Sequence, residues 1–231
     1  MKSFSGDTEV ARRTKEEALV TRNKLLDAAE CLFQSQGVSR TTLQDIALRA
    51  GATRGAVYWH FKDKADLFNA MMERVTLPLE AYFNHEAAPA ETSSDAYPLE
   101  RMRNAILKAL NQIVNDPQTR RVLEVATQKV EYIEELKTIR LRHLAVRNGF
   151  LCRVQQGLDA ASRHENLKLP LSSALAAQGL HALIDGLIQN WLLDPQAFDL
   201  LEAGQSTMDI YFTGLGFGSE PQSLAPAAGK K

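Results

Sequence analysis

The sequence predicts an all-α protein, and three observations support this. Apolar residues recur at helical spacing through most of the chain, and no stretch alternates polar and apolar residues with the period of a strand. Proline and glycine separate these segments, where helices are expected to begin and end. The chain also lacks a glycine-rich phosphate loop and any internal repeat.

The chain opens with an expected flexible arm, residues 1–13, in which Gly, Ser, Thr and Lys occur without periodicity. A first helix is predicted from about Thr14 to Gln36, and Gly37 is expected to end it. The apolar face of this helix, which should pack beneath the elements that follow, consists of Leu25, Ala29, Leu32 and Phe33.

Residues 41–64 contain the sharpest local signals and predict two short helices joined by a tight turn. Thr42, followed three residues later by Asp45, forms a capping-box start. Gly51 can take the left-handed conformation that closes a helix, and Thr53 can cap the next one. Together with the first helix, they predict a three-helix, helix-turn-helix domain over residues 14–63.

The second short helix has more exposed side chains than packing requires, since Ala56, Val57 and Phe61 suffice to anchor it. Small, aromatic and hydrogen-bonding groups on one exposed helix suit the major groove of DNA, which admits one α-helix. We therefore expect double-stranded DNA as a partner. The candidate DNA-binding residues are Thr42, Thr53, Arg54, Gly55, Tyr58, Trp59, His60 and Lys64.

Each role follows from the chemistry of the side chain. Arg54 is expected to reach a guanine edge or a phosphate, and Gly55 to let the backbone approach a base. Tyr58, His60 and Lys64 are expected to bond phosphates, which fix register without reading sequence. The charge distribution agrees, because the chain up to Lys64 carries eleven Lys and Arg against eight Asp and Glu, and the remainder carries sixteen against twenty.

The next helix is expected to be capped by Asp63 and to continue into the body of the protein, ending or kinking near Pro78. Its tilt can therefore transmit a change between head and body.

Residues 87–98 have the composition of a loop. Five body helices are predicted with Pro117, Pro170 and Pro195 at helix starts: residues 99–115, 117–132, 133–163, 171–193 and 195–212. Residues 214–231 are expected to form a flexible tail.

The helix over residues 171–193 has two apolar surfaces. One should face the interior of a ligand-binding and dimerisation domain, residues 64–213, and the other the same helix of a second subunit, with residues 195–212 completing a four-helix seam. The alternative is a fully buried helix in a monomer. The candidate dimer-interface residues are Leu183, Leu187, Trp191 and Phe212.

Composition narrows the function classes. The 231 residues are 45% hydrophobic and 24% charged, which is ordinary for a globular protein. No apolar run is long enough to span a membrane or to act as a secretory signal. Cys31 and Cys152 lack metal-ligand spacing and predict buried structural thiols, with a redox switch as the alternative. We expect a cytoplasmic protein with no metal, no cofactor and no membrane partner.

No catalytic constellation is recognisable, so the sequence does not predict an enzyme. His85 and Glu86 lack the second histidine of a zinc-protease helix, and no nucleophile elbow occurs. Two classes remain open: a regulator that reads an operator, and an architectural or scaffolding module that binds DNA non-specifically.

The run Thr-Arg-Gly-Ala-Val-Tyr-Trp-His-Phe-Lys-Asp-Lys, residues 53–64, resembles the signature of the tetracycline-repressor (TetR) family. Trp59 and the segment from Arg13 to Val38 are similar to the AcrR-like and TtgR-like regulators that repress multidrug efflux pumps. The resemblance implies a homodimer that is released from a palindromic operator when a hydrophobic small molecule binds its body.

By the same resemblance, Asp185, Leu123 and Thr127 occupy positions of the ligand pocket. Leucine, threonine and His181 stand here where relatives carry other side chains, so the ligand does not carry over. Asp185 either fixes the polar end of a hydrophobic ligand or makes a structural hydrogen bond. Further candidate lining residues, which have core packing as their alternative role, are Met72, Val75 and Met102.

Overall fold

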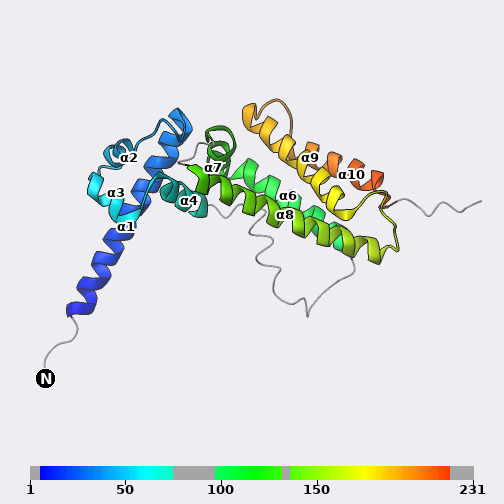
Figure 1. The fold of residues 1–231 in the computed structure, drawn as a ribbon, viewed down its shortest axis with the longest axis horizontal. Coiled ribbons are helices and arrows are strands. Elements are labelled where there is room, and N and C mark those ends of the chain that lie inside the picture. The colour runs from blue at the N-terminus through cyan, green and yellow to red at the C-terminus, as the bar shows by residue number, and fades with distance from the viewer. Residues whose placement is uncertain (1–5, 75–96, 132–135, 219–231) are drawn as a thin grey trace, which may run out of the picture. The chain divides into compact units, whose positions relative to one another are not determined.

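The computed structural model describes residues 6–74, 97–131 and 136–218, and these contain helices, turns and bends but no strand (Figure 1). The prediction of an all-α fold is therefore confirmed for the described ranges. Their helices are α1 (Gly6–Gln36), α2 (Leu43–Arg49), α3 (Arg54–His60), α4 (Lys64–Arg74), α6 (Pro98–Asn115), α7 (Pro117–Gln128), α8 (Lys137–His164), α9 (Ser173–Leu193) and α10 (Leu200–Gly214).

The N-terminal helix is longer than predicted. It begins at Gly6, so residues 6–13 are helical rather than part of a flexible arm. Residues 9–18 contain no Gly or Pro and are rich in Glu, Ala, Arg and Lys, which all have high helix propensity. These propensities extend a helix even where no apolar stripe marks it.

Helix ends in the N-terminal half agree with the sequence signals. Gly37 and Gly51 have positive φ angles of 87° and 65°, in the left-handed region that glycine adopts without steric cost. Pro117 lies in the first turn of α7, and the Asp116 side chain accepts a hydrogen bond from the Gln118 amide at 3.1 Å.

The predicted starts of two body helices, at residues 171 and 195, are wrong. In both helices a capping side chain, and not the nearby proline, marks the first turn. α9 begins after Ser172, whose hydroxyl accepts from the Leu175 amide, so Pro170 lies outside the helix. Residues 194–199 form a turn that contains Pro195, and Asp199 caps α10 by accepting from the Leu201 and Glu202 amides.

The predicted tail also starts too early. Leu215 and Phe217 are buried, 3% exposed each, and the Phe217 ring packs edge-to-face on Phe212 with centroids 6.3 Å apart. Gly216, with φ of 99°, turns the chain back after α10 and so returns these two apolar side chains to the core. Pro78, most of the predicted loop 87–98 and residues 219–231 lie outside the described residues.

The chain divides into two compact units that do not follow the predicted boundary between residues 63 and 64. Unit 1 comprises residues 1–81 with 112–147, and unit 2 comprises residues 82–111 with 148–231. Unit 1 therefore contains α4 and α7 in addition to the helix-turn-helix. Its continuous apolar core joins side chains of α1, α2, α3, α4, α7 and the start of α8, among them Leu26, Phe33, Ile46, Val57, Phe68, Val125 and Ile139.

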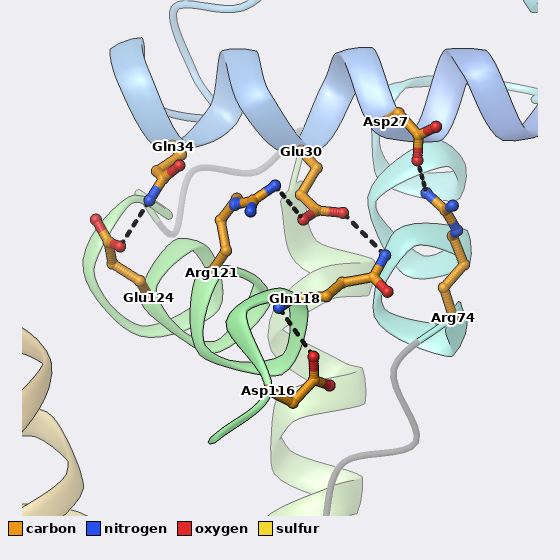
Figure 2. A network of polar contacts seen from close by, with 8 residues as sticks. All are labelled: Asp27, Glu30, Gln34, Arg74, Asp116, Gln118, Arg121 and Glu124. Carbon is orange, nitrogen blue, oxygen red and sulfur yellow. Dashed lines mark hydrogen bonds and ion pairs between the residues drawn. The ribbon is translucent and has the colours of Figure 1, made fainter. Parts of the chain in front are cut away.

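A polar network ties α1 to α7 and α4 inside unit 1 (Figure 2). Arg121 and Gln118 of α7 both bind the buried Glu30 carboxylate of α1, at 3.0 and 3.3 Å. One turn later, Gln34 donates to Glu124 at 2.9 Å. One turn earlier on the same face of α1, Asp27 pairs with Arg74 of α4 at 2.6 Å (Figure 2). Each side chain is held by a partner that is distant in the sequence.

Unit 2 is built around the pair α9 and α10, which lie side by side (Figure 1). The Tyr211 hydroxyl of α10 donates to the Ala176 carbonyl of α9 at 2.8 Å, and Gly179 leaves the space that the phenol ring occupies. α10 also contacts α6, where Arg103 pairs with Asp209 and lies over the Phe212 ring.

Candidate nucleic-acid interface

α3 is anchored by few residues and leaves its other side chains accessible. Val57 is fully buried and Phe61 is 2% exposed, and both belong to the core of unit 1. In contrast, Tyr58 is 50% exposed and Trp59 is 72% exposed. Two exposed aromatic rings on a seven-residue helix are not explained by packing within unit 1.

The two threonines of the candidate set hold the ends of the helices. The Thr42 hydroxyl accepts from the Asp45 amide at 3.1 Å, while the Asp45 carboxylate accepts from the Thr42 amide at 2.9 Å. The hydrogen bonds from the hydroxyl and amide of Thr42 lower the pKa of Asp45. Thr53 accepts from the Ala56 amide at 3.2 Å and so fixes the start of α3.

Arg54 and Tyr58 lie one turn apart on the exposed face of α3. The Arg54 guanidinium donates to the Tyr58 hydroxyl at 3.3 Å and lies 5.5 Å from the centre of the phenol ring. A Cβ built on Gly55 would meet only the Thr53 hydroxyl oxygen, at 3.8 Å, so packing within the protein does not demand a glycine there. The close approach to a base that we expect of Gly55 stays a prediction.

His60 differs from its neighbours because it is partly buried. Its ring meets the Trp59 ring edge-on at 4.5 Å. Burial, followed by the nearby Arg22 guanidinium, lowers the pKa of His60, which favours the neutral imidazole. A neutral imidazole can still donate one hydrogen bond to a phosphate oxygen.

Lys64 is used inside the protein. Its ammonium donates to the carbonyl oxygens of Ser39 and Thr41, at 3.0 and 3.1 Å, in the loop before α2. Thr41 is itself fully buried and donates to the Gly37 carbonyl at 2.7 Å. Lys64 therefore holds the first helix of the helix-turn-helix in place. Local spacing could not reveal this contact, because it joins residues more than twenty positions apart.

Sequence reasoning passed over the other exposed basic residues of the head. Arg40, Arg49 and Lys62 are exposed in unit 1; Arg49 is the last residue of α2, and Lys62 lies two residues after the end of α3. The sequence could have indicated these residues, because basic side chains in and beside a helix-turn-helix are expected to lie near DNA phosphates.

The candidate ligand residues lie in both units. In unit 1, Met72 is buried in the core, Leu123 packs against that core, and the Thr127 hydroxyl donates to the Leu123 carbonyl at 2.8 Å. Val75 lies outside the described residues. In unit 2, Met102 is buried and its sulfur lies 3.3 Å from the position that a Cβ on Gly157 would take.

His181 and Asp185 of α9 are both half-buried. The His181 ring lies 5.4 Å from that of Phe150 on α8, and the Asp185 carboxylate accepts from the Gln189 amide one turn later at 3.2 Å. The single hydrogen bond from the Gln189 side chain uses only part of the acceptor capacity of the Asp185 carboxylate, which can accept further hydrogen bonds from another group. Both candidate roles of Asp185 therefore stay open.

Two of the four predicted dimer-interface residues are buried within the protomer. Trp191 and Phe212 are 5% and 1% exposed within the protomer, because they point into the core of unit 2. Leu183 is 39% exposed and Leu187 is half-buried, as an interface requires. Two further apolar residues, outside the candidate interface set, are exposed: Leu175 of α9 (61%) and Ile210 of α10 (75%). Apolar side chains this accessible on paired helices favour a covering partner.

The cysteine and membrane predictions have separate outcomes. Cys31 is partly buried, but Cys152 is exposed on α8, so the prediction of two buried thiols is wrong for Cys152. Among the described helices, none has the length and apolarity needed to cross a bilayer. The described residues also contain no group of three or more potential metal ligands.

Comparisons with known proteins cover both halves of the chain. Residues 25–71 match the family described as bacterial regulatory proteins, tetR family, and residues 97–217 match the C-terminal region of MAATS-type transcriptional repressors. The regulator TtgR of Pseudomonas putida is 39% identical over 192 residues, which cover 83% of this chain and 90% of that protein. AcrR of Shigella flexneri is 37% identical over 206 residues, which cover 87% and 92%.

Solved structures agree. NalD, the secondary repressor of the MexAB-OprM multidrug efflux pump in Pseudomonas aeruginosa, superposes with a TM-score of 0.75 at 36% identity, covering 87% of this chain and 98% of NalD. A complex of SmeT with triclosan gives a TM-score of 0.73 at 28% identity, covering 91% of this chain and 99% of SmeT.

Proposed function

This chain belongs to the TetR family of bacterial regulatory proteins, which are DNA-binding transcription regulators and not enzymes, and from this membership we propose that it represses a multidrug efflux operon. Relatives with efflux-pump repressor in their descriptions support the choice of operon. The observation that carries the proposal is the exposed face of α3, which presents Arg54, Tyr58 and Trp59 on a helix anchored by buried Val57.

The protein acts as a homodimer on a palindromic operator. Each α3 enters one major groove, and the two grooves lie about one helical turn apart on the same face of the duplex. The exposed leucines of α9 and Ile210 of α10 supply the apolar surface on which two copies meet. Arg54 reads a base edge, while Tyr58 and His60 bind phosphates. Binding of this kind takes place in the cytoplasm.

A hydrophobic small molecule releases the operator by binding near Asp185 and His181. SmeT, a similar protein, has been solved in complex with the small molecule triclosan, and this supports a small-molecule ligand. Only a ligand that binds the released conformation more tightly than the DNA-bound one can do this. Within unit 1, α4 and α7 are attached to α1 through Arg74 and Arg121, so movement of either helix carries the head with it.

The test is binding of the purified protein to the intergenic DNA beside its own gene, at two salt concentrations, with and without a panel of hydrophobic amphipathic drugs. The proposal expects tight, palindrome-dependent binding that at least one drug releases, and loss of drug response with retained DNA affinity in Asp185→Ala. Weak, sequence-blind binding with a steep salt dependence would favour the architectural alternative instead.

A further inference from the structure

Unit 2 contains a cleft of about 480 Å³ that none of the residues discussed as ligand-binding candidates lines. We call it the Tyr97 cleft. It is formed by the start of α6, the end of α8 and the end of α10. The lining residues on which its chemistry depends are Tyr97, Glu100, Arg103, Glu165, Asp209 and Phe217.

The charge of the Tyr97 cleft is negative. Three carboxylates line it, those of Glu100, Glu165 and Asp209, against the guanidinium of Arg103. That guanidinium is already engaged, because it pairs with Asp209, lies 3.4 Å from Glu100 and stacks over the Phe212 ring at 5.5 Å. The cleft therefore repels anions and favours a positively charged occupant.

Aromatic rings, among them Tyr97, Phe212 and Phe217, also line the cleft. Tyr97 is 66% exposed, and its ring lies 6.2 Å from that of His164. Phe212 and Phe217 also line the cleft, although only 1% and 3% of their surfaces are exposed. A ring that is accessible beside carboxylates attracts an organic cation through its negative face, whereas a small metal ion gains little from such a surface and needs more oxygen ligands.

We propose that the Tyr97 cleft binds an organic cation with an aromatic body, at a second ligand site separate from the one proposed near Asp185. The positive group lies among Glu165, Glu100 and Asp209, and the aromatic body lies against Tyr97 and Phe217. A volume of about 480 Å³ accommodates one molecule of this kind. Salt should weaken the binding, since Glu165 is exposed and the side chains of Glu100 and Asp209 are 55% and 47% exposed.

The test is calorimetric titration of the full-length protein with phenyltrimethylammonium and with its neutral isostere tert-butylbenzene. The cation should bind and the isostere should not, and raising the salt concentration should lower the affinity for the cation. Glu165→Gln and Tyr97→Leu should each lower that affinity about threefold, which is the effect expected from losing one exposed charge contact or one cation–π contact. Glu202→Gln, which removes an exposed carboxylate of α10 outside the cleft, is the matched control.

Three outcomes would overturn the proposal: equal binding of the neutral isostere, loss of cation binding in Asp185→Asn but not in Glu165→Gln, or binding that appears only after residues 219–231 are deleted. The last would make the C-terminal segment the natural occupant. Operator binding and cation binding are measured in separate experiments. A protein that does not bind the operator can still bind the cation, and a protein that does not bind the cation can still repress the operon.

Discussion

Arg121 of α7 forms an ion pair with Glu30 of α1 at 3.0 Å, although the two residues are 91 positions apart and the Glu30 side chain is only 3% exposed (Figure 2). Gln118 binds the other oxygen of the same carboxylate. A buried carboxylate persists only when it is paired and hydrogen-bonded, so this contact joins α7 firmly to the helix that supports the DNA-binding head.

Removing the arginine should therefore destabilise the protein. Arg121→Ala leaves the Glu30 carboxylate buried without its cation, and we expect a loss of about 2 kcal/mol in the free energy of unfolding. Urea unfolding followed by circular dichroism measures it. Arg49→Ala, an exposed arginine of the same unit, is the control and should change stability by less than about 0.5 kcal/mol. Equal effects of the two variants would show that the ion pair contributes nothing.

DNA readout should separate Arg54 from Tyr58. Arg54→Ala is expected to cost about 1 to 3 kcal/mol on the operator and to relax the preference at one base pair. Tyr58→Phe removes the hydroxyl that we propose bonds a phosphate, and it should weaken binding to operator and scrambled DNA equally, by about 1 kcal/mol. Fluorescence anisotropy on both sequences measures the two effects. An unchanged operator preference in Arg54→Ala would make Arg54 a phosphate contact.

Two glycines of α9 offer a matched pair. A Cβ at Gly179 would overlap the Tyr211 hydroxyl, which is fixed by its hydrogen bond to Ala176, so Gly179→Ala should destabilise the α9–α10 pair by about 1 to 3 kcal/mol. A Cβ at Gly186 would meet no atom of the protomer within 4 Å, and Gly186→Ala should gain up to about 1 kcal/mol of helix propensity. Thermal unfolding of both variants at one protein concentration tests this; the same sign for both would contradict the packing described.

His60 predicts a pH dependence of stability. Burial lowers the pKa of His60 below its ordinary value of 6.5, so the unfolded chain binds the proton more readily than the folded one. The contribution of His60 is therefore fully present above pH 6.5 and is lost as the pH falls through the folded pKa. The free energy of unfolding of His60→Asn should fall less steeply than that of the unchanged protein over this acid range. Parallel curves would contradict the assignment.

Local signals in the sequence predicted the head well. The capping box of Thr42 and Asp45, the left-handed Gly51 and the cap at Thr53 each depend on residues within a few positions, and the structure contains all of them. Long-range contacts left no such signal. The use of Lys64 by the loop carbonyls of Ser39 and Thr41 is one example, and the pairing of Glu30 with Arg121 is another.

The body was harder to predict, because an apolar helix face does not say which neighbour covers it. Trp191 and Phe212 carry the same periodic signal as Leu183, but they are buried within the protomer while Leu183 is accessible. Pro195 likewise indicated a helix boundary only approximately, since the Asp199 cap determines where α10 begins. The roles of the candidate DNA-binding and ligand-binding residues stay predictions.

Footprinting on the intergenic DNA tests the central claim most directly. We expect two protected patches on one face of the duplex, about one helical turn apart and related by the palindrome, because each protomer inserts one α3. Adding a releasing drug should abolish both patches together, and Arg54→Ala should lose them at concentrations where the unchanged protein keeps them. Diffuse protection along the whole fragment, unaffected by sequence or drug, would contradict the account.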